Sequence, residues 1–264
     1  MLELKNVKKT FNRGSVNEKQ ALNGVNLKLE PGDFVTVIGG NGAGKSTMLN
    51  MIAGVYPVDS GAVVIDGKNV TRQPDYKRAA YLGRVFQDPM MGTAADMEIE
   101  ENLAMAYRRG KRRGLGWGIL KQEKKTYHEA LKMLDLGLEE RMSSKVGLLS
   151  GGQRQALTLL MATLRQPKVL LLDEHTAALD PKTAAKVLEL TQELIEKNHL
   201  TTLMITHNMK DAIRLGNRLI MMHEGTIIYD VKGEEKKRLK VPDLLAKFEE
   251  ASQGEFANDR MLLS

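Results

Sequence analysis

Apolar and polar side chains alternate near the start of the chain, in residues 2–5 and again in residues 25–30. A period of two predicts β-strands with one face against a core and the other toward water. Residues 34–38, 169–172 and 201–205 are instead mostly apolar. These short runs predict strands that are buried.

The period lengthens to about 3.6 between residues 89 and 149, which predicts helices. The apolar positions with this spacing are Ile99, Leu103, Ala106, Leu131, Leu134 and Leu138. We therefore expect a helical insertion in a chain that otherwise alternates strands and helices, the pattern of an α/β fold.

The last part of the chain predicts three further features. Residues 218–230 indicate a hairpin that turns at Glu224-Gly225. Residues 241–251 predict an amphipathic helix, and the charged residues 233–238 between them predict a solvated connector.

Composition limits the class of protein. The chain has 264 residues, 42% of them hydrophobic, 27% charged and none cysteine, with a net charge of +6. This is an ordinary globular composition, and the absence of cysteine excludes disulfides and thiolate metal sites. No apolar run reaches the roughly 18 to 20 residues of a membrane span, and the N-terminus lacks the apolar region of a signal peptide. We therefore expect the chain to stay in the cytosol.

A glycine-rich motif follows the buried strand at 34–38 and precedes an apolar helix pattern. Residues 39–47 fit G-x-x-x-x-G-K-[ST], in which glycines let backbone N–H groups turn toward phosphates at a helix N-terminus. Lys45 is expected to reach the outer phosphates, and the Ser46 hydroxyl to ligate Mg²⁺. The residues assigned to this nucleotide site are Gly39, Asn41, Gly42, Ala43, Gly44, Lys45, Ser46 and Thr47.

A second glycine-rich helix start, without a lysine, occurs at Leu149-Ser150-Gly151-Gly152-Gln153. The Ser150 hydroxyl, the amides of the two glycines and the helix dipole can all face a phosphate. Because one loop already holds the nucleotide, the second is explained best if it serves a nucleotide bound to another copy of the chain.

Two acids end the buried strand at 169–172. Carboxylates at the carboxyl end of an apolar strand require a cation, so we expect Asp173 to hold Mg²⁺ and Glu174 to activate the attacking water. Gln87, at the end of the strand at 81–86, reaches Mg²⁺ or the attacking water in one interpretation and caps a loop in the other. His207 follows the strand at 201–205 and is expected to contact the γ-phosphate, and Phe11 to stack on an adenine ring.

The densest basic run is Arg108-Arg109-Gly110-Lys111-Arg112-Arg113, shortly before the only tryptophan, Trp117. Three interpretations stay open for it. It is a solvated loop, a contact with a membrane partner near anionic lipid, or a contact with nucleic acid. A single tryptophan without interleaved aromatic residues disfavours the third, so no nucleic-acid partner is expected.

These motifs together resemble the ATPases of the ABC type. The resemblance covers roughly residues 1–230 and rests on the loop at 39–47, Gln87, LSGGQ at 149–153, LLLDE at 170–174, the ALD loop ending at Asp180, and His207. It implies an α/β P-loop NTPase fold with a RecA-like core, an antiparallel β subdomain and a helical subdomain inserted at about 89–149. Residues 231–264 are then a C-terminal helical tail.

The same resemblance implies how such a protein works. Two copies would form a head-to-tail homodimer around two ATP molecules with Mg²⁺, so that LSGGQ and Asp180 join the nucleotide site. Gln87 and the helical lobe would contact an integral membrane permease, with the chain peripheral on the cytoplasmic face of the membrane. The predicted function is ATP hydrolysis that powers substrate import.

One position departs from the family pattern. His175 stands after Glu174 where a proline is usual, which restores an N–H and leaves the local φ less fixed. The string around it is similar to the ATPases of a bacterial importer group that is fed by a substrate-binding lipoprotein and proposed to carry aromatic amino acids such as tryptophan. The alternatives are an exporter ATPase, a non-transport ABC ATPase that acts on nucleic acid or ribosomes, and a P-loop kinase, which LSGGQ disfavours.

Overall fold

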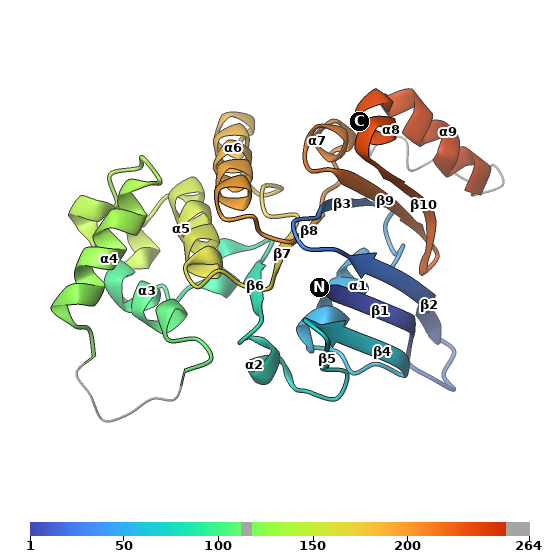
Figure 1. The fold of residues 1–264 in the computed structure, drawn as a ribbon, viewed down its shortest axis with the longest axis horizontal. Helices are drawn as coiled ribbons and strands as arrows, with labels where there is room; N and C mark the ends of the chain where they lie inside the picture. Colours follow the sequence, from blue (N-terminus) through green and yellow to red (C-terminus); the bar gives the residue numbers. More distant parts are fainter. Residues whose placement is uncertain (112–117, 252–264) are drawn as a thin grey trace. The chain divides into compact units, whose positions relative to one another are not determined.

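The structure, a computed structural model, describes residues 1–111 and 118–251. Two compact units divide the chain. The first unit consists of Met1–Arg78 and His199–Ser264, and the second is Ala79–Asn198 (Figure 1). The chain therefore leaves the first unit after Arg78 and returns to it at His199.

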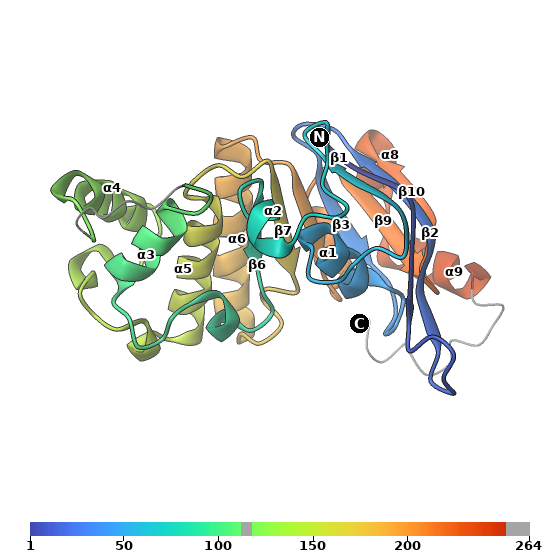
Figure 2. The same cartoon turned by 90° about the horizontal axis from the view of Figure 1, so that it is seen from below.

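The first unit contains an antiparallel sheet in the order β2-β1-β4-β5. Its elements are β1 (Leu2–Phe11), β2 (Lys19–Leu29), β4 (Ser60–Ile65), β5 (Lys68–Asn69) and the short helix α2 (Asp75–Arg78). Leu2 pairs with Leu29 and Leu4 with Leu27, and all four side chains are buried. The alternation predicted from the sequence is confirmed, and β1 and β2 run side by side in Figures 1 and 2.

Four more strands of the first unit lie in the order β10-β9-β3-β8. The strands and the helices that follow them are β3 (Phe34–Ile38), α1 (Lys45–Ala53), β8 (Thr202–Ile205), α7 (Met209–Arg214), β9 (Arg218–His223) and β10 (Thr226–Lys232). Strand β3 is parallel to both of its neighbours, β8 and β9, and every one of its residues is buried. Parallel strands with helical connections explain why this run is apolar except for Thr36, whose hydroxyl donates to the Ala212 carbonyl oxygen at 2.8 Å.

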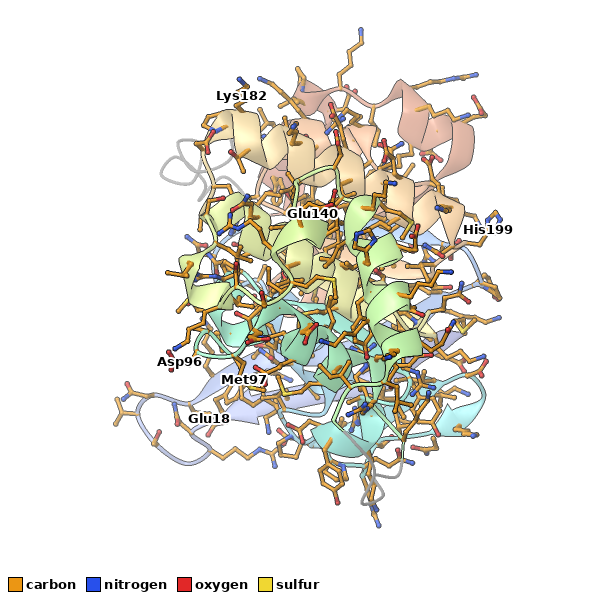
Figure 3. All side chains as sticks on the ribbon, turned by 90° about the vertical axis from the view of Figure 1, so that its left-hand side faces the viewer. Glu18, Asp96, Met97, Glu140, Lys182 and His199 are labelled. Carbon is orange, nitrogen blue, oxygen red and sulfur yellow. The ribbon has the colours of Figure 1, made fainter. Side chains whose placement is uncertain are left out.

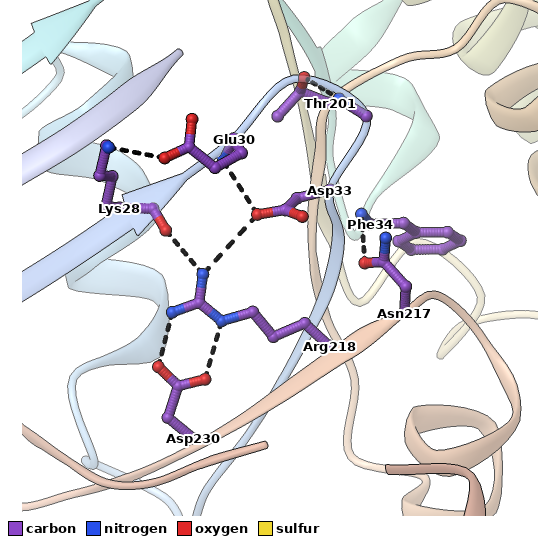
Figure 4. Close-up of polar contacts among 9 residues, drawn as sticks. Lys28, Glu30, Asp33, Phe34, Thr201, Asn217, Arg218 and Asp230 are labelled. Carbon is purple, nitrogen blue, oxygen red and sulfur yellow. Dashed lines mark hydrogen bonds and ion pairs between the residues drawn. The ribbon is translucent and has the colours of Figure 1, made fainter. Parts of the chain in front are cut away.

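Arg218 joins several strands of the first unit (Figure 4). Its Nε and Nη2 donate to the two carboxylate oxygens of Asp230 at 2.7 and 2.6 Å, and its Nη1 donates to the Lys28 carbonyl oxygen at 2.6 Å. The Asp33 carboxylate lies 3.7 Å from the same Nη1. A bidentate guanidinium pair is geometrically specific, so Arg218, at the start of β9, ties β10 and the end of β2 to that strand.

The C-terminal part of the first unit corrects one prediction. The predicted connector at 233–238 is a helix, α8 (Gly233–Arg238), followed by α9 (Val241–Ala251). Lys236 is buried, and its ammonium donates to the carbonyl oxygens of Ile213, Leu215 and Gly216 at the end of α7. The sequence did not reveal this contact, because one buried lysine among the five charged residues of this run gives no periodic signal. The predicted helix at 241–251 is confirmed, and residues 252–264 of the predicted tail lie outside the described residues.

The second unit carries two parallel strands and several helices. They are β6 (Leu82–Val85), α3 (Ile99–Tyr107), α4 (Lys121–Lys132), α5 (Gly151–Thr163), β7 (Val169–Asp173) and α6 (Pro181–Lys197), with single 3₁₀ turns at Pro89–Gly92, Glu139–Arg141 and Val146–Leu148. Helices α3, α4 and α5 share one apolar core that includes Leu103, Leu131 and Leu157. In the described residues of the predicted helical stretch at 89–149, each regular element is an α-helix or a 3₁₀ turn.

Side-chain and backbone contacts fix the start of α3, which begins shortly after Asp96 and Met97, two of the residues labelled in Figure 3. Glu98 caps this helix with Glu101, whose carboxylate accepts from the Glu98 N–H at 2.8 Å. The Val146 N–H donates to the Met97 carbonyl oxygen at 3.0 Å, so the chain before α3 is held against the chain before α5.

Among residues 1–111 and 118–251, no helix combines the length and apolar character that a membrane span requires.

Candidate nucleotide-binding and hydrolysis site

The glycine-rich loop at 39–47, called the phosphate loop below, lies at the carboxyl end of β3 in the first unit. Lys45 is 5% exposed, and its Nζ donates to the carbonyl oxygens of Gly39 and Gly40 at 2.6 and 3.0 Å. Helix α1 begins at this lysine, and no side chain caps its N-terminus. The backbone N–H groups of its first turn and the helix dipole therefore offer a site for an anion.

Close backbone contacts hold this loop and explain one of its glycines. Gly44 has a φ of 99°, and a Cβ on it would lie 2.5 Å from the Ala21 carbonyl oxygen. The Gly225 N–H donates to the Ala43 carbonyl oxygen at 3.0 Å, and the Asn23 N–H donates to the Gly225 carbonyl oxygen at 2.9 Å. The predicted hairpin turn at Gly225 therefore helps to hold the phosphate loop through a backbone hydrogen bond.

His207 lies at the same edge of the sheet as the phosphate loop. Strands β3 and β8 are parallel, with Val37 opposite Ile205, so the segments that follow both strands emerge together. The Thr206 N–H, one residue beyond Ile205, donates to the Val37 carbonyl oxygen at 3.2 Å. The structure thus brings the two predicted γ-phosphate contacts of the first unit, Lys45 and His207, to one edge.

Phe11 ends β1 and packs against an aromatic side chain that the sequence analysis did not single out. Its ring makes an edge-to-face contact with Tyr56, with centroids 5.3 Å apart and an interplanar angle of 81°. Lys9 lies 5.4 Å from the Phe11 ring centroid. Tyr56 therefore orients the ring that is expected to stack on adenine.

Asp59 fixes the strand end that carries Phe11. Its carboxylate accepts from the Thr10 N–H at 2.7 Å and from the Lys9 Nζ at 3.0 Å. Burial works against ionisation, but these bonds and the neighbouring cations outweigh it and lower the pKa of Asp59 from its usual 3.8.

We expect Asp59→Asn to lower the free energy of unfolding by about 1 kcal/mol at pH 7. The carboxylate contributes fully above pH 3.8, and its contribution is lost as the pH falls through the lower pKa of the folded state. The difference between the two proteins should therefore shrink in acid. Chemical denaturation at pH 7 and near pH 3 measures it, with the exposed Asp96→Asn as control. A difference that does not change with pH would contradict the role of the charge.

The second unit brings Asp173 and Gln87 to the carboxyl edge of its own two strands. Strands β6 and β7 are parallel, with Val85 opposite Leu172, so the residues that follow them lie at the same edge. The Arg84 Nη2 lies 3.7 Å from the Asp173 carboxylate, a partner that the sequence analysis did not find. An arginine at this distance attracts the carboxylate and helps to orient it.

Glu174 and His175 form the start of the turn after β7. Glu174 has a φ of 45°, in the left-handed region that non-glycine residues seldom adopt. The Ala177 N–H donates to the Glu174 carbonyl oxygen at 2.9 Å. His175 is 1% exposed, and burial lowers its pKa to about 4, so its imidazole is neutral at pH 7. The residue in the usual proline position is therefore part of the core.

The LSGGQ segment begins α5 in the expected way. Ser150 is the N-cap: its Oγ accepts from the Gln153 N–H at 3.3 Å, while its own N–H donates to the Gln153 Oε1 at 3.1 Å. Ser150 and Gly151 are exposed. Gln153 therefore stabilises the helix start, and the segment presents Ser150 and the glycine to the exterior.

Two other predicted groups have structural roles in the second unit. Asp180 caps α6, because its Oδ1 accepts from the Thr183 N–H at 3.1 Å; the bonds to Thr183 also lower its pKa. In the basic run, Arg108 pairs with Glu123 at 2.7 Å, and the Arg109 Nη2 donates to the Ala162 carbonyl oxygen at 3.0 Å. These two arginines are thus engaged within the helical core, and Arg112 and Arg113 lie outside the described residues.

The predicted site residues fall into two sets. Phe11, the phosphate loop and His207 belong to the first unit, and the residues at 87, 150–153, 173–174 and 180 belong to the second. Each unit offers hard oxygen donors of the kind that suits Mg²⁺: the Ser46 hydroxyl in the first, and the Asp173 carboxylate and the Gln87 amide oxygen in the second. Within the described ranges, no three His, Cys, Asp or Glu side chains cluster to hold a metal by themselves.

Five residues that contact the predicted site residues or their neighbours in the chain were not predicted from the sequence. They are Lys19, Tyr56, Asp59, Arg84 and Thr191. The Lys19 Nζ comes within 2.9 Å of the position that a Cβ on Gly42 would take, which adds a cation beside the phosphate loop. No motif marks these residues, because their contacts join segments that are separated in the chain.

Similar proteins are known for nearly the whole chain. The tyrosine transport ATP-binding protein of Clostridioides difficile is 44% identical over 251 residues, which are 95% of this chain and 100% of that protein. The xylose/arabinose import ATP-binding protein of Sulfolobus acidocaldarius is 35% identical and covers 94% of each chain. A solved dimeric ATP-binding cassette in a post-hydrolysis state, bound to ADP and Pi, has a TM-score of 0.75 at 33% identity and covers 88% of this chain and 98% of that one.

The family model described as ABC transporter matches residues 22–177, more than half of the chain. The matched range includes the phosphate loop, LSGGQ and the two acids at the end of β7. The expected fold, an α/β P-loop cassette with an antiparallel sheet and an inserted helical segment, is confirmed by the solved cassettes. The chain therefore belongs to the ABC transporter family, as one of its ATPases.

Proposed function

We propose that this chain hydrolyses ATP as a homodimer and that this hydrolysis powers import of an aromatic amino acid through a membrane permease. The observation that carries the proposal is the phosphate loop, with buried Lys45 and an uncapped helix N-terminus, at the same edge of the sheet as His207. We assign residues 1–230 to the ATPase domain, 89–149 to its helical subdomain and 231–264 to a tail.

In the proposed site, the first unit binds the nucleotide. The adenine would stack on Phe11, and Lys45 with the N–H groups of the loop would bind the outer phosphates. The Lys45 ammonium already lies among loop carbonyl groups, so a phosphate that replaces one of these acceptors costs little rearrangement. His207 would donate to the γ-phosphate.

The second unit would supply the catalytic groups. Glu174 would accept a proton from the attacking water, and Gln87 would orient that water or contribute its amide oxygen to the metal. Ser46 and Asp173 would hold Mg²⁺, which neutralises charge on the phosphates when it is bound. The Arg84 guanidinium, 3.7 Å from Asp173, would hold that carboxylate in place for the metal.

The second phosphate cradle supports a dimer. Ser150 and Gly151 are exposed at the start of α5, and the chain has no second lysine-containing loop for them to serve. The solved relative with 33% identity is itself described as dimeric. We propose that Ser150 and the glycines close over the nucleotide of a partner copy, and that Asp180, the N-cap of α6, lies at the same interface.

A mixing experiment tests the shared site. Ser150→Asp keeps a good N-cap but brings a negative charge toward the phosphates, so this variant alone should lose ATPase activity. Lys45→Ala alone should also be inactive. Mixed together, the two variants form heterodimers with one intact site, and activity should reappear. Ser143→Asp, the same change at an exposed serine outside the proposed site, is the control and should stay active. No recovery in a mixture that light scattering shows to be dimeric would contradict the shared site.

Import and cargo rest on the relatives. One is named as a tyrosine transport protein and another as a sugar import protein, and the former is the more similar of the two. We therefore propose an aromatic amino acid as cargo, delivered to the permease by an extracytoplasmic substrate-binding protein. Cells that carry Lys45→Ala in place of the native chain should lose uptake of labelled tyrosine or tryptophan and keep uptake of labelled arginine. If the variant cells took up all three amino acids as well as wild-type cells do, tyrosine and tryptophan would be excluded as the cargo.

A further inference from the structure

A buried hydrogen bond ties the turn after Glu174 to the middle of α6. The His175 Nε2 lies 3.0 Å from the Thr191 Oγ1, and the two residues are 1% and 0% exposed. Helix α6 runs over Pro181–Lys197, so Thr191 is well inside a regular helix. A side chain held by this residue is therefore held by a rigid element.

The hydroxyl of Thr191 determines which imidazole nitrogen carries the proton. Its Oγ1 donates to the Val187 carbonyl oxygen at 2.6 Å, which uses the one hydroxyl proton. The same Oγ1 must then accept, so His175 donates from Nε2–H, and Nδ1 carries a lone pair. Within the described residues that Nδ1 has no hydrogen-bond partner. The bond to Thr191 is thus the single polar restraint on the ring that the described contacts provide.

The residue before this histidine is the one whose direction matters for hydrolysis. Glu174 has a φ of 45°, a conformation that persists only where the surroundings impose it. Strand β7 fixes the chain before it, and the Asp180 cap fixes the chain five residues after His175. Between these two fixed segments, His175 is buried and is held by its hydrogen bond to Thr191. Where the family usually has a proline, which restricts φ by its ring, this chain has a side-chain hydrogen bond.

We propose that His175 is a positioning residue, which holds the Glu174 carboxylate in the direction needed for water activation through its hydrogen bond to Thr191. The inference rests on the general-base role of Glu174 in the proposed function. Neither His175 nor Thr191 touches the nucleotide in this proposal. Their effect should therefore fall on turnover, because small displacements of a base cost rate, and not on ATP affinity.

Thr191→Val tests the restraint with almost no change in volume. We expect kcat for ATP hydrolysis to fall about ten-fold, with the Kd for ATP unchanged within about two-fold. Thr191→Ser, which keeps the hydroxyl, should restore kcat. The matched control is Thr163→Val, because Thr163 is also buried in a helix and donates to a backbone carbonyl oxygen, that of Leu159, at 2.9 Å. It should leave kcat unchanged.

A double variant separates positioning from stability. Thr191→Val alone leaves a buried N–H without an acceptor, so its Tm should fall, whereas His175→Leu with Thr191→Val replaces both polar partners with apolar groups. We expect the double variant to recover most of the Tm and to keep the low kcat. Recovery of kcat together with Tm would overturn the proposal, as would a wild-type kcat in Thr191→Val. Glu174→Gln distinguishes the two failures: if it turned over normally, the general-base role itself would be wrong.

Discussion

Glu174→Gln should lower kcat for ATP hydrolysis by about 10² to 10⁴, because an amide cannot accept the proton of the attacking water. The substitution keeps the size of the side chain and its hydrogen-bonding capacity, so the turn after β7 should keep its shape. ATP affinity should stay close to wild type, since the phosphate loop and His207, which are proposed to bind the phosphates within the same copy, belong to the other unit. Phosphate release and equilibrium ATP binding measure the two effects.

The same variant should accumulate a dimer in the presence of Mg²⁺ and ATP. If a nucleotide shared between two copies joins them, blocking hydrolysis leaves the joined state in place. Light scattering should report a monomer without nucleotide and a dimer with ATP. Glu189→Gln, the same change on the exposed face of α6, is the control for both measurements. A Glu174→Gln protein that turns over normally, or that stays a monomer with bound ATP, would contradict the mechanism.

Much of the fold could be predicted because its signals are local. Alternation in residues 2–5 and 25–30 predicted strands with one wet face, and the apolar run at 34–38 predicted a buried strand. The phosphate loop also depends on local chemistry, since Gly44 must take a φ of 99° and start a helix. A sequence read in order can identify such features, because the residues that make them are neighbours in the chain.

The supporting contacts could not be predicted, because they join residues that are far apart in sequence. Tyr56 lies against Phe11, Arg84 beside Asp173, and Asp59 against the Thr10 N–H only once the strands pair. The helix α8 was missed for a related reason. Its charged sequence predicts solvent exposure, whereas Lys236 gains three carbonyl acceptors at the end of α7 that no local pattern reveals.

The positive charges of the basic run did not reveal from the sequence that Arg109 is part of a folded core. From the sequence, Arg108 and Arg109 were candidates for a solvated loop or a partner contact. In the structure Arg109 hydrogen-bonds to the backbone of α5, and burial, with the nearby Arg165, lowers its pKa. Removing that guanidinium should therefore destabilise the helical core in addition to any effect on a partner. A test of partner binding at this run would have to leave Arg109 in place.

Lys45→Ala should weaken ATP binding by about 10- to 100-fold, the range that corresponds to the loss of one charge-assisted hydrogen bond. The effect should be large because Lys45 is buried at the start of α1, where solvent screens its charge little. Equilibrium binding of ATP at a fixed Mg²⁺ concentration measures it, and thermal unfolding without nucleotide checks that the loop carbonyl groups of Gly39 and Gly40 tolerate the loss.

Lys45→Arg is the informative companion to that variant. It keeps the positive charge, but a planar guanidinium is larger than an ammonium and directs its donors differently. The ammonium site is closed by Gly39 and Gly40, whose carbonyl oxygens lie 2.6 and 3.0 Å from Nζ, so an arginine should not fit without displacing the loop. If charge alone bound the phosphates, Lys45→Arg would keep its ATP affinity; if the geometry of the loop matters as we propose, it should lose most of it. Wild-type affinity in Lys45→Ala would instead show that this lysine does not bind the phosphates.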